Sequence, residues 1–181
     1  RKLIEAWEAA GKPENVRCLL SAHGLPEVVV KSGDPYQWQV ERTVEALKPL
    51  LPAEWEIEIC YQSRVGPLKW IGPATDLSIE KAAKDGKAIL LSPIAFVSEH
   101  IETLVELDFE YKHLADKHGA KVYLRAPALG VDQGFVETLA DLVEASLADA
   151  DKSIRSSCGG RICPTNWKDC PNRRSAATKA A

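Results

Sequence analysis

The chain has 181 residues, a length that suits one domain or one and a half. Lysine and arginine total 23 and aspartate and glutamate 26, so the formal charge is −3, which argues against a dedicated nucleic-acid binder. Hydrophobic residues make up 45%, too many for a disordered chain, and no apolar run approaches the roughly 20 residues of a membrane span. We therefore expect a soluble globular protein with a substantial core.

The first residues, Arg1 to Ala10, have the pattern of a helix already under way. They lack the apolar centre and the cleavage site of a signal peptide. We interpret residues 1–13 as the end of a preceding helix and expect the chain to be a fragment. Residues 14–150 are then predicted to form one sheet domain, and residues 151–181 a cysteine-containing extension with a tail.

Four strand-then-helix units follow in chain order. Short apolar runs predict strands at 16–22, 56–61, 88–92 and 121–125, because strands buried on both faces do not alternate. Helices are predicted at 35–50, 76–84, 99–118 and 132–148, with Asp34 and Ser98 as N-caps and Gly119 as a terminator. This alternation predicts an α/β fold with a four-stranded, parallel, doubly wound, Rossmann-like sheet. Ligands bind such sheets beyond the carboxyl ends of the strands.

His23 stands at the end of the first predicted strand, in the sequence SAHGLP (21–26). Gly24 and Pro26 interrupt regular structure directly after it. A neutral imidazole in such a place can bind a metal or accept a proton near neutral pH. The alternative is a histidine that only caps a loop through the backbone, and spacing alone favours that alternative.

Acidic side chains recur along the helix predicted after the third strand. Glu99, Glu102 and Glu106 are three and four residues apart, so a regular helix places them on one face, and Glu110 continues the line. Such a stripe leading away from a strand end can pass divalent cations or protons, whereas a generic helix favours a solvated acidic face. His100 beside the stripe favours the metal reading, because imidazole and carboxylate together suit borderline divalent metals.

The loop at 61–73, after the second strand, is rich in turn-forming residues and carries one large aromatic side chain. Arg64 and Lys69 can hold an anionic ligand there, and Trp70 can cover a flat one. A packed loop that Trp70 merely anchors is an equally good reading of these residues.

The chain has five cysteines, an odd number that does not fit a secreted disulfide framework and favours a cytosolic protein. Cys18 and Cys60 lie within predicted strands and read as small buried hydrophobes. The other three, Cys158, Cys163 and Cys170, crowd the C-terminus and suggest an iron–sulfur or zinc site. Their spacing matches neither the common zinc nor the common ferredoxin pattern, and a fourth ligand is missing, so an unliganded tail is the alternative.

Four stretches together resemble the ferrochelatase family, whose members insert ferrous iron into protoporphyrin IX to form protohaem in haem biosynthesis. They are SAHGLP (21–26), GDPY (33–36), QSRVGPLKWIGP (62–73) and PIAFVSEHIETLVELDFEY (93–111), of which the last is long and specific. The resemblance covers residues 14–149 and corresponds to the C-terminal half of that enzyme. The family fold has two similar Rossmann-like halves with a porphyrin cleft between them.

The resemblance also implies roles for individual residues. His23 is similar to the active-site histidine, a metal ligand or proton acceptor, and Glu102 to its carboxylate partner, with His100 as a third catalytic candidate. The implied porphyrin-binding residues are Phe96, Trp70 and Ser63, and the implied metal-handling residues are His23, Glu102, Glu99 and Glu106.

Some family members hold a two-iron two-sulfur (2Fe-2S) cluster through C-terminal cysteines, and Cys158, Cys163 and Cys170 fall in the corresponding region. The resemblance further suggests a cytoplasmic enzyme with porphyrin as its partner, with a peripheral contact at the inner membrane and a homodimer as further expectations. The alternatives are a chelatase for another tetrapyrrole or metal, and a non-catalytic tetrapyrrole- or metal-binding module.

Overall fold

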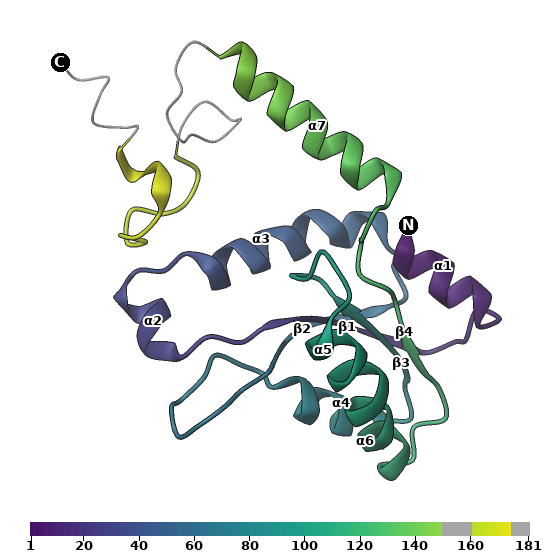
Figure 1. Ribbon diagram of the computed structural model, residues 1–181. Coiled ribbons are helices and arrows are strands. Elements are labelled where there is room, and N and C mark those ends of the chain that lie inside the picture. The colour runs from purple at the N-terminus through teal and green to yellow at the C-terminus, as the bar shows by residue number, and fades with distance from the viewer. Residues whose placement is uncertain (150–160, 175–181) are drawn as a thin grey trace. The chain divides into compact units, whose positions relative to one another are not determined.

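The computed structural model describes residues 1–149 and 161–174. At its centre lies a four-stranded, all-parallel sheet in the order β2-β1-β3-β4 (Figure 1). The strands are β1 (Val16–His23), β2 (Glu56–Gln62), β3 (Ala88–Pro93) and β4 (Tyr123–Arg125). The predicted parallel sheet is confirmed, although β4 starts at Tyr123, later than the predicted start at Lys121.

The strand order places a topological switch beside β1. This strand pairs with β2 on one side and with β3 on the other, so the connections leave it in opposite directions. His23 is in register with Gln62, and Ser21 is in register with Pro93. The carboxyl ends of these three strands therefore meet at one edge, which is where ligands bind in sheets of this kind.

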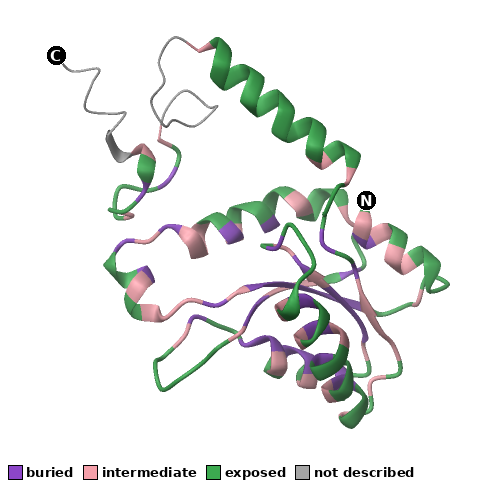
Figure 2. Cartoon of the chain, viewed as in Figure 1, coloured by how far each residue is buried: buried purple, intermediate pink, exposed green. Residues whose placement is uncertain are grey.

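Helices cover both faces of the sheet, and the side chains of the strands alternate between two cores (Figure 1). Leu19, Ile89 and Leu91 pack against α4 (Thr75–Lys84) and α6 (Tyr111–Lys117). Cys18, Leu20 and Leu90 pack on the other face, with α1 (Lys2–Ala9) and the second half of α3 (Tyr36–Leu47). The two central strands, β1 and β3, are accordingly buried over most of their length, as the purple ribbon of Figure 2 shows.

Leu90→Ala is expected to lower the free energy of unfolding by about 3 kcal/mol, because Leu90 is fully buried in the second core. Leu68→Ala is the matched control, since Leu68 is a leucine that is more than half exposed. It is expected to change stability by less than about 0.5 kcal/mol. Urea unfolding followed by tryptophan fluorescence measures both values, and equal effects would contradict the assignment of Leu90 to the core.

Helix ends follow the sequence signals in most places. Asp34 accepts a hydrogen bond from the backbone N–H of Tyr36 at 2.8 Å, and Asp132 accepts one from Phe135 at the start of α7 (Gln133–Ala148). Gly119 follows the last turn of α6 with a φ of +80°, the left-handed conformation that a terminating glycine supplies. The helix α2 (Glu27–Ser32) and the short helix η3 (Pro171–Arg174) were not predicted, and the end of the helix predicted at 35–50 is the short 3₁₀ helix η1 (Lys48–Leu50).

Contacts between Cα atoms divide the chain into two compact units. The first unit, Arg1–Glu27 with Val40–Gly130, contains the whole sheet. The second unit, Val28–Gln39 with Val131–Ala181, contains most of α2, the first turn of α3, and α7. Among the described residues, no helix is both long and apolar enough to cross a bilayer.

The long helix predicted over residues 99–118 is confirmed in extent from Ile101 to Lys117, but it is not one regular α-helix. The segment consists of α5 (Ile101–Leu104), the π-helix η2 (Glu106–Glu110) and then α6. The backbone N–H of Glu110 bonds the carbonyl of Val105, five residues earlier, where an α-helix would bond four residues earlier. The N-cap is His100 and not Ser98, because His100 is the last extended residue and its ring accepts from the N–H of Glu102.

Candidate active site

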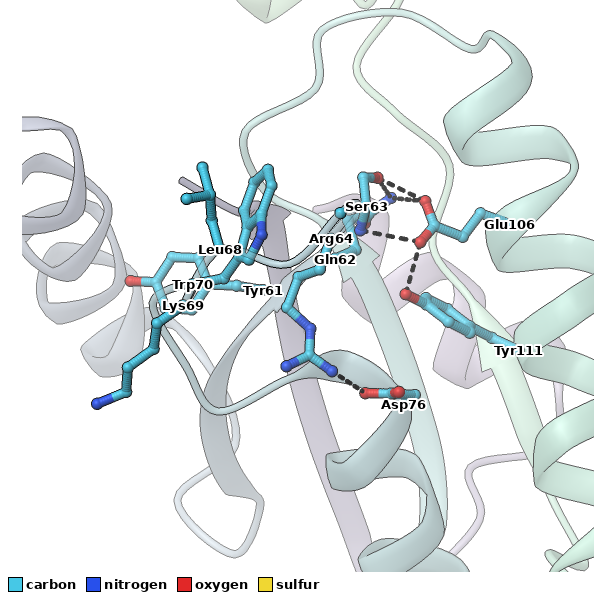
Figure 3. A pocket seen from close by; sticks show the side chains of 11 residues that line it. Tyr61, Gln62, Ser63, Arg64, Leu68, Lys69, Trp70, Asp76, Glu106 and Tyr111 are labelled. Atoms are coloured by element: carbon cyan, nitrogen blue, oxygen red, sulfur yellow. Dashed lines mark hydrogen bonds and ion pairs between the residues drawn. The ribbon is translucent and has the colours of Figure 1, made fainter. Parts of the chain in front are cut away.

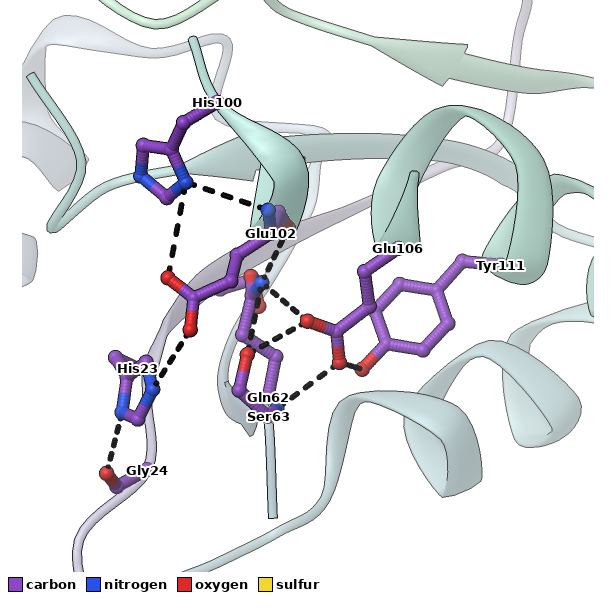
Figure 4. Close-up of polar contacts among 9 residues, drawn as sticks. His23, Gly24, Gln62, Ser63, His100, Glu102, Glu106 and Tyr111 are labelled. Carbon is purple, nitrogen blue, oxygen red and sulfur yellow. Dashed lines mark hydrogen bonds and ion pairs between the residues drawn. The ribbon is translucent and has the colours of Figure 1, made fainter. Parts of the chain in front are cut away.

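His23 and Glu102 face each other at the carboxyl edge of the sheet (Figure 4). The Nδ1 atom of His23 lies 2.7 Å from the carbonyl oxygen of Gly24, and because a carbonyl only accepts, Nδ1 carries the proton. The Nε2 atom then presents a lone pair, 3.3 Å from Oε1 of Glu102. An imidazole lone pair and a carboxylate oxygen directed at each other form a place that accepts a proton or a divalent cation.

His100 lies on the other side of the same carboxylate. Its Nδ1 accepts a hydrogen bond from the backbone N–H of Glu102 at 3.3 Å and lies 3.7 Å from Oε2. Glu102 is thus flanked by two imidazoles, and all three side chains are about 40% exposed. Phe96 is buried and its ring centroid lies 6.4 Å from that of His23 and 5.2 Å from that of His100. The ring therefore places an apolar side chain next to both histidines.

Glu106 sits behind this pair and is fully engaged by neutral hydrogen-bond donors. Its carboxylate accepts from the N–H and Oγ of Ser63, from Nε2 of Gln62 and from the hydroxyl of Tyr111, at 2.6–3.0 Å (Figure 4). Burial raises the pKa of the Tyr111 hydroxyl, and the adjacent Glu106 carboxylate raises it further. Gln62 also donates to the backbone carbonyl of Glu102 at 3.0 Å. The network therefore ties the end of β2 to the helix that carries Glu102.

The predicted one-face stripe of carboxylates is wrong, and the π-helix explains part of the difference. Glu102 faces His23 and Glu106 faces Ser63, whereas Glu110 is exposed. Glu99 precedes the helix and bonds elsewhere: its Oε1 accepts from Arg125 at 2.5 Å and from the N–H of Ala128 at 2.8 Å. The extra residue in the π turn rotates the following side chains relative to a regular helix, so sequence spacing no longer reports a shared face.

The Glu99 carboxylate is held in its ionised form. Partial burial on its own would raise its pKa, but hydrogen bonds from Thr103, Arg125 and the backbone of Ala128 hold it below the ordinary value. A carboxylate with a lowered pKa in the folded state adds stability above its unfolded pKa, and this stability is lost as pH falls through the folded pKa.

Glu99→Gln is therefore expected to lower the free energy of unfolding near neutral pH and to have little effect on it at acid pH. The difference in free energy of unfolding between wild type and Glu99→Gln should be complete at pH 6 and should shrink as pH falls below about 4.5. Urea unfolding at a series of pH values measures this difference, with Glu110→Gln as a control on the exposed side of the same segment. A difference that does not change with pH would contradict the role of the Glu99 charge.

The loop after β2 lines a pocket of about 580 Å³ that is open to solvent (Figure 3). Trp70 and Leu68 line one side of the pocket, and Glu106 and Tyr111 line the other. The two cations expected to bind an anion are already paired: Arg64 lies 3.4 Å from Asp76, and Lys69 lies 2.9 Å from Glu27.

Two backbone features hold this loop over the end of β1. Trp70 pairs with Pro26 in an isolated bridge, and its indole N–H donates to the carbonyl of Val65 at 3.2 Å. A Cβ atom at Gly24 would lie 3.0 Å from the Gln62 carbonyl oxygen and 3.1 Å from the Trp70 ring. Only glycine at position 24 allows this close approach, so the bare backbone after His23 is required by packing.

The structure brings together part of the predicted set of site residues. His23, Glu102, His100 and Phe96 are adjacent, whereas Glu99 and Glu106 have other partners. Over residues 1–149 and 161–174, no group of three or more His, Cys, Asp or Glu side chains is arranged to hold a metal ion. Sequence analysis missed the roles of Tyr111 and Arg125, although Tyr111 ends the motif at 93–111 and Arg125 ends the strand predicted at 121–125.

The cysteines divide into two buried thiols and a C-terminal pair. Burial raises the pKa of Cys18 and of Cys60 to about 12, and both thiols are free, as predicted for small hydrophobes. Cys163 and Cys170 form a disulfide, and the third predicted cluster ligand, Cys158, lies outside the described residues. The side chain of Arg161 donates to the carbonyls of Cys163 and Trp167, which closes the loop around the pair.

Comparison with known proteins agrees with this architecture. The sequence model of the ferrochelatase family matches residues 1–147. The chain is 58% identical over 170 residues to a protein named ferrochelatase from Hyphomonas neptunium, covering 94% of this chain and 47% of that protein. Ferrochelatases from Caulobacter vibrioides and Phenylobacterium zucineum are 52% and 53% identical, over 98% and 96% of this chain.

The chain spans about half the length of these curated relatives, since it covers 51% and 50% of the Caulobacter and Phenylobacterium proteins. The family match itself extends over most of the chain and includes every strand of the sheet and both partners of the His23–Glu102 pair. The chain therefore belongs to the ferrochelatase family.

Proposed function

We propose that the protein inserts ferrous iron into protoporphyrin IX to form protohaem, as a metal–porphyrin lyase of haem biosynthesis. One observation carries the proposal: the Nε2 lone pair of His23 faces a carboxylate oxygen of Glu102 at 3.3 Å while Nδ1 is committed to a backbone carbonyl. Membership of the ferrochelatase family supports the choice of substrates.

The chemistry requires a base and a cation-binding group at the same place. Metallation removes two protons from the pyrrole nitrogens of the porphyrin and places a desolvated divalent cation among the four ring nitrogens, with no change of oxidation state. His23 is suited to accept a proton at Nε2, because the imidazolium formed is stabilised by Glu102. Glu102 and Nε2 of His23 together offer the oxygen and nitrogen donors that a borderline divalent cation prefers, whereas Nδ1 of His100 already accepts the backbone N–H of Glu102.

Apolar surfaces next to the pair suit a flat macrocycle. The Phe96 ring lies near both histidines, and the Trp70 ring lies next to Gly24. Ser63, expected to contact the porphyrin, donates its hydroxyl to Glu106 at 2.6 Å and so acts on the substrate only through that network. We therefore assign porphyrin contact to Phe96 and Trp70 in this half of the protein.

The test is zinc insertion into protoporphyrin, followed by the fluorescence of the product, in the longest natural chain that contains these residues. Turnover by the wild type is the expected result. Competition with a more highly carboxylated porphyrin distinguishes a chelatase for another tetrapyrrole. Porphyrin binding without turnover, in a chain of the length of its curated relatives, would favour a non-catalytic binding module.

The C-terminal cysteines are proposed as ligands of a 2Fe-2S cluster, with Cys163 and Cys170 contributing from one short loop and Cys158 as a third ligand. The closeness of the two sulfur atoms supports this, since the same pair can meet either as a disulfide or across a metal centre. Protein purified without oxygen from iron-replete cells should be coloured and contain equal amounts of iron and sulfide. Colourless, iron-free protein with one intact disulfide would refute the cluster.

We also propose that the protein is cytoplasmic, with a peripheral contact at the inner membrane. We further propose that it forms a homodimer. The apolar porphyrin substrate supports a membrane contact, because such a substrate partitions into lipid. Sedimentation with lipid vesicles and analytical ultracentrifugation of the same sample test the two expectations separately.

A further inference from the structure

We propose that Arg125 is a positioning residue for the His23–Glu102 pair, and that Glu99 anchors Arg125 and does not carry metal. The inference rests on the proposed function, because it assigns a role in the same reaction. It concerns a residue at the end of β4 that contacts neither His23 nor Glu102 in the described hydrogen bonds and ion pairs.

Arg125 makes a two-sided clamp. Its Nε and Nη2 atoms each donate to Asp108 at 2.7 Å, in the paired geometry that fixes both side chains, and its Nη1 atom donates to Glu99 at 2.5 Å. Only 14% of the Arg125 side chain is exposed, so these contacts are largely shielded from solvent. The two carboxylates hold the guanidinium firmly in its charged form and raise its pKa above the ordinary value.

The two anchors of the clamp bracket the reactive segment. Glu99 lies directly before His100, and Asp108 lies in the π-helix, so the clamp fixes both ends of the stretch that carries Glu102 and Glu106. α5 is a single turn from Ile101 to Leu104 that passes through Val105 directly into η2, and a turn this short depends on tertiary contacts for its stability. The position of Glu102 therefore depends on what holds the ends of the segment.

The negative charges of residues 99–110 also indicate that this segment depends on Arg125. Five carboxylates fall within residues 99–110, namely Glu99, Glu102, Glu106, Asp108 and Glu110. Arg125 pairs with two of them, and four neutral donors hold Glu106. Glu102 is the carboxylate of this stretch that faces His23. Without Arg125, Glu99 and Asp108 would repel Glu102 and favour an altered path of this segment.

The test compares Arg125→Gln with Arg17→Gln. Arg17 is the matched control because it is a buried arginine that also pairs with two carboxylates, Glu56 and Asp85, near the opposite end of the sheet. Zinc insertion is measured at a temperature at which circular dichroism shows both variants folded. We expect Arg125→Gln to lower kcat about 10- to 100-fold, the loss typical of a misplaced reacting group, and Arg17→Gln to leave kcat within about twofold.

Glu99→Gln tests the second half of the proposal. The amide still accepts hydrogen bonds but lacks the charge that strengthens the clamp, so kcat should fall less than in Arg125→Gln, with the KM for zinc unchanged. A carboxylate that carries metal gives the opposite result, a raised KM for zinc with kcat preserved at saturation. That outcome would overturn the assignment of Glu99.

Equal losses of kcat in Arg125→Gln and Arg17→Gln would show that Arg125 acts only through stability, and would overturn the first half. If the wild type does not metallate porphyrin at all, the proposed function fails, and hydrogen exchange still decides the inference. Backbone amides of residues 99–110 should then exchange at least about tenfold faster in Arg125→Gln than in wild type. Their exchange rates in Arg17→Gln should equal those of the wild type. Unchanged exchange in both variants would refute the clamp.

Discussion

Glu102→Gln is expected to lower the rate of porphyrin metallation, at saturating zinc and porphyrin, by about 100-fold or more. The glutamine keeps the shape of the side chain and loses the negative charge that faces Nε2 of His23 at 3.3 Å. It therefore neither stabilises the imidazolium that forms when His23 accepts a proton nor attracts a divalent cation. The measurement is the initial rate of zinc protoporphyrin fluorescence in the full natural chain, with the folded fraction checked by circular dichroism.

Glu110→Gln is the matched control, because it removes an exposed carboxylate from the same segment at a distance from the histidines. We expect its rate to stay within about twofold of wild type. Equal losses in both variants would mean that the rate depends on the general negative charge of this segment and that Glu102 has no special role. A Glu102→Gln variant with wild-type kcat would remove the basis of the proposed mechanism.

Most of the fold could be predicted from the sequence, because the strands are buried on both faces and give continuous apolar runs. All four strands, their parallel direction and the edge that carries His23 followed from this pattern, whereas the strand order was not predicted. The helix cap at Asp34 and the terminator Gly119 were also predicted, since each depends on the chemistry of one residue and its immediate neighbours, whereas the predicted cap Ser98 was wrong.

The arrangement behind the site could not be predicted, because it depends on contacts that are distant in sequence. A π turn arises when tertiary bonds compensate for one extra residue, and here Ser63 and Arg125 reach the segment from other strands. The spacing of Glu99, Glu102 and Glu106 indicated a regular acidic face and so gave the wrong neighbours. The family resemblance named His23, Glu102, Glu99 and Glu106 together, and only the structure shows that the last two have other partners.

Glu106→Leu is expected to lower the free energy of unfolding by about 4 kcal/mol. The substitution removes the acceptor of four hydrogen bonds and leaves the N–H and hydroxyl of Ser63 and the hydroxyl of Tyr111 without it. Tyr111 is buried, and the cost of an unsatisfied buried polar group is larger than the gain from forming its bond. Urea unfolding of the wild type and the variant at pH 7 measures the difference.

Tyr111→Phe is the comparison that distinguishes a structural role of Glu106 from a role in handling metal. It removes one of the four donors and leaves the Glu106 carboxylate and the other three donors in place, so we expect a loss of only about 1 kcal/mol. If Glu106 is chiefly an anchor, turnover in the two variants should follow the order of their stability losses, because Gln62 links Glu106 to the backbone of Glu102. A Glu106→Leu protein as stable as the wild type, with a strongly raised KM for zinc, would instead identify Glu106 as a carboxylate that handles metal.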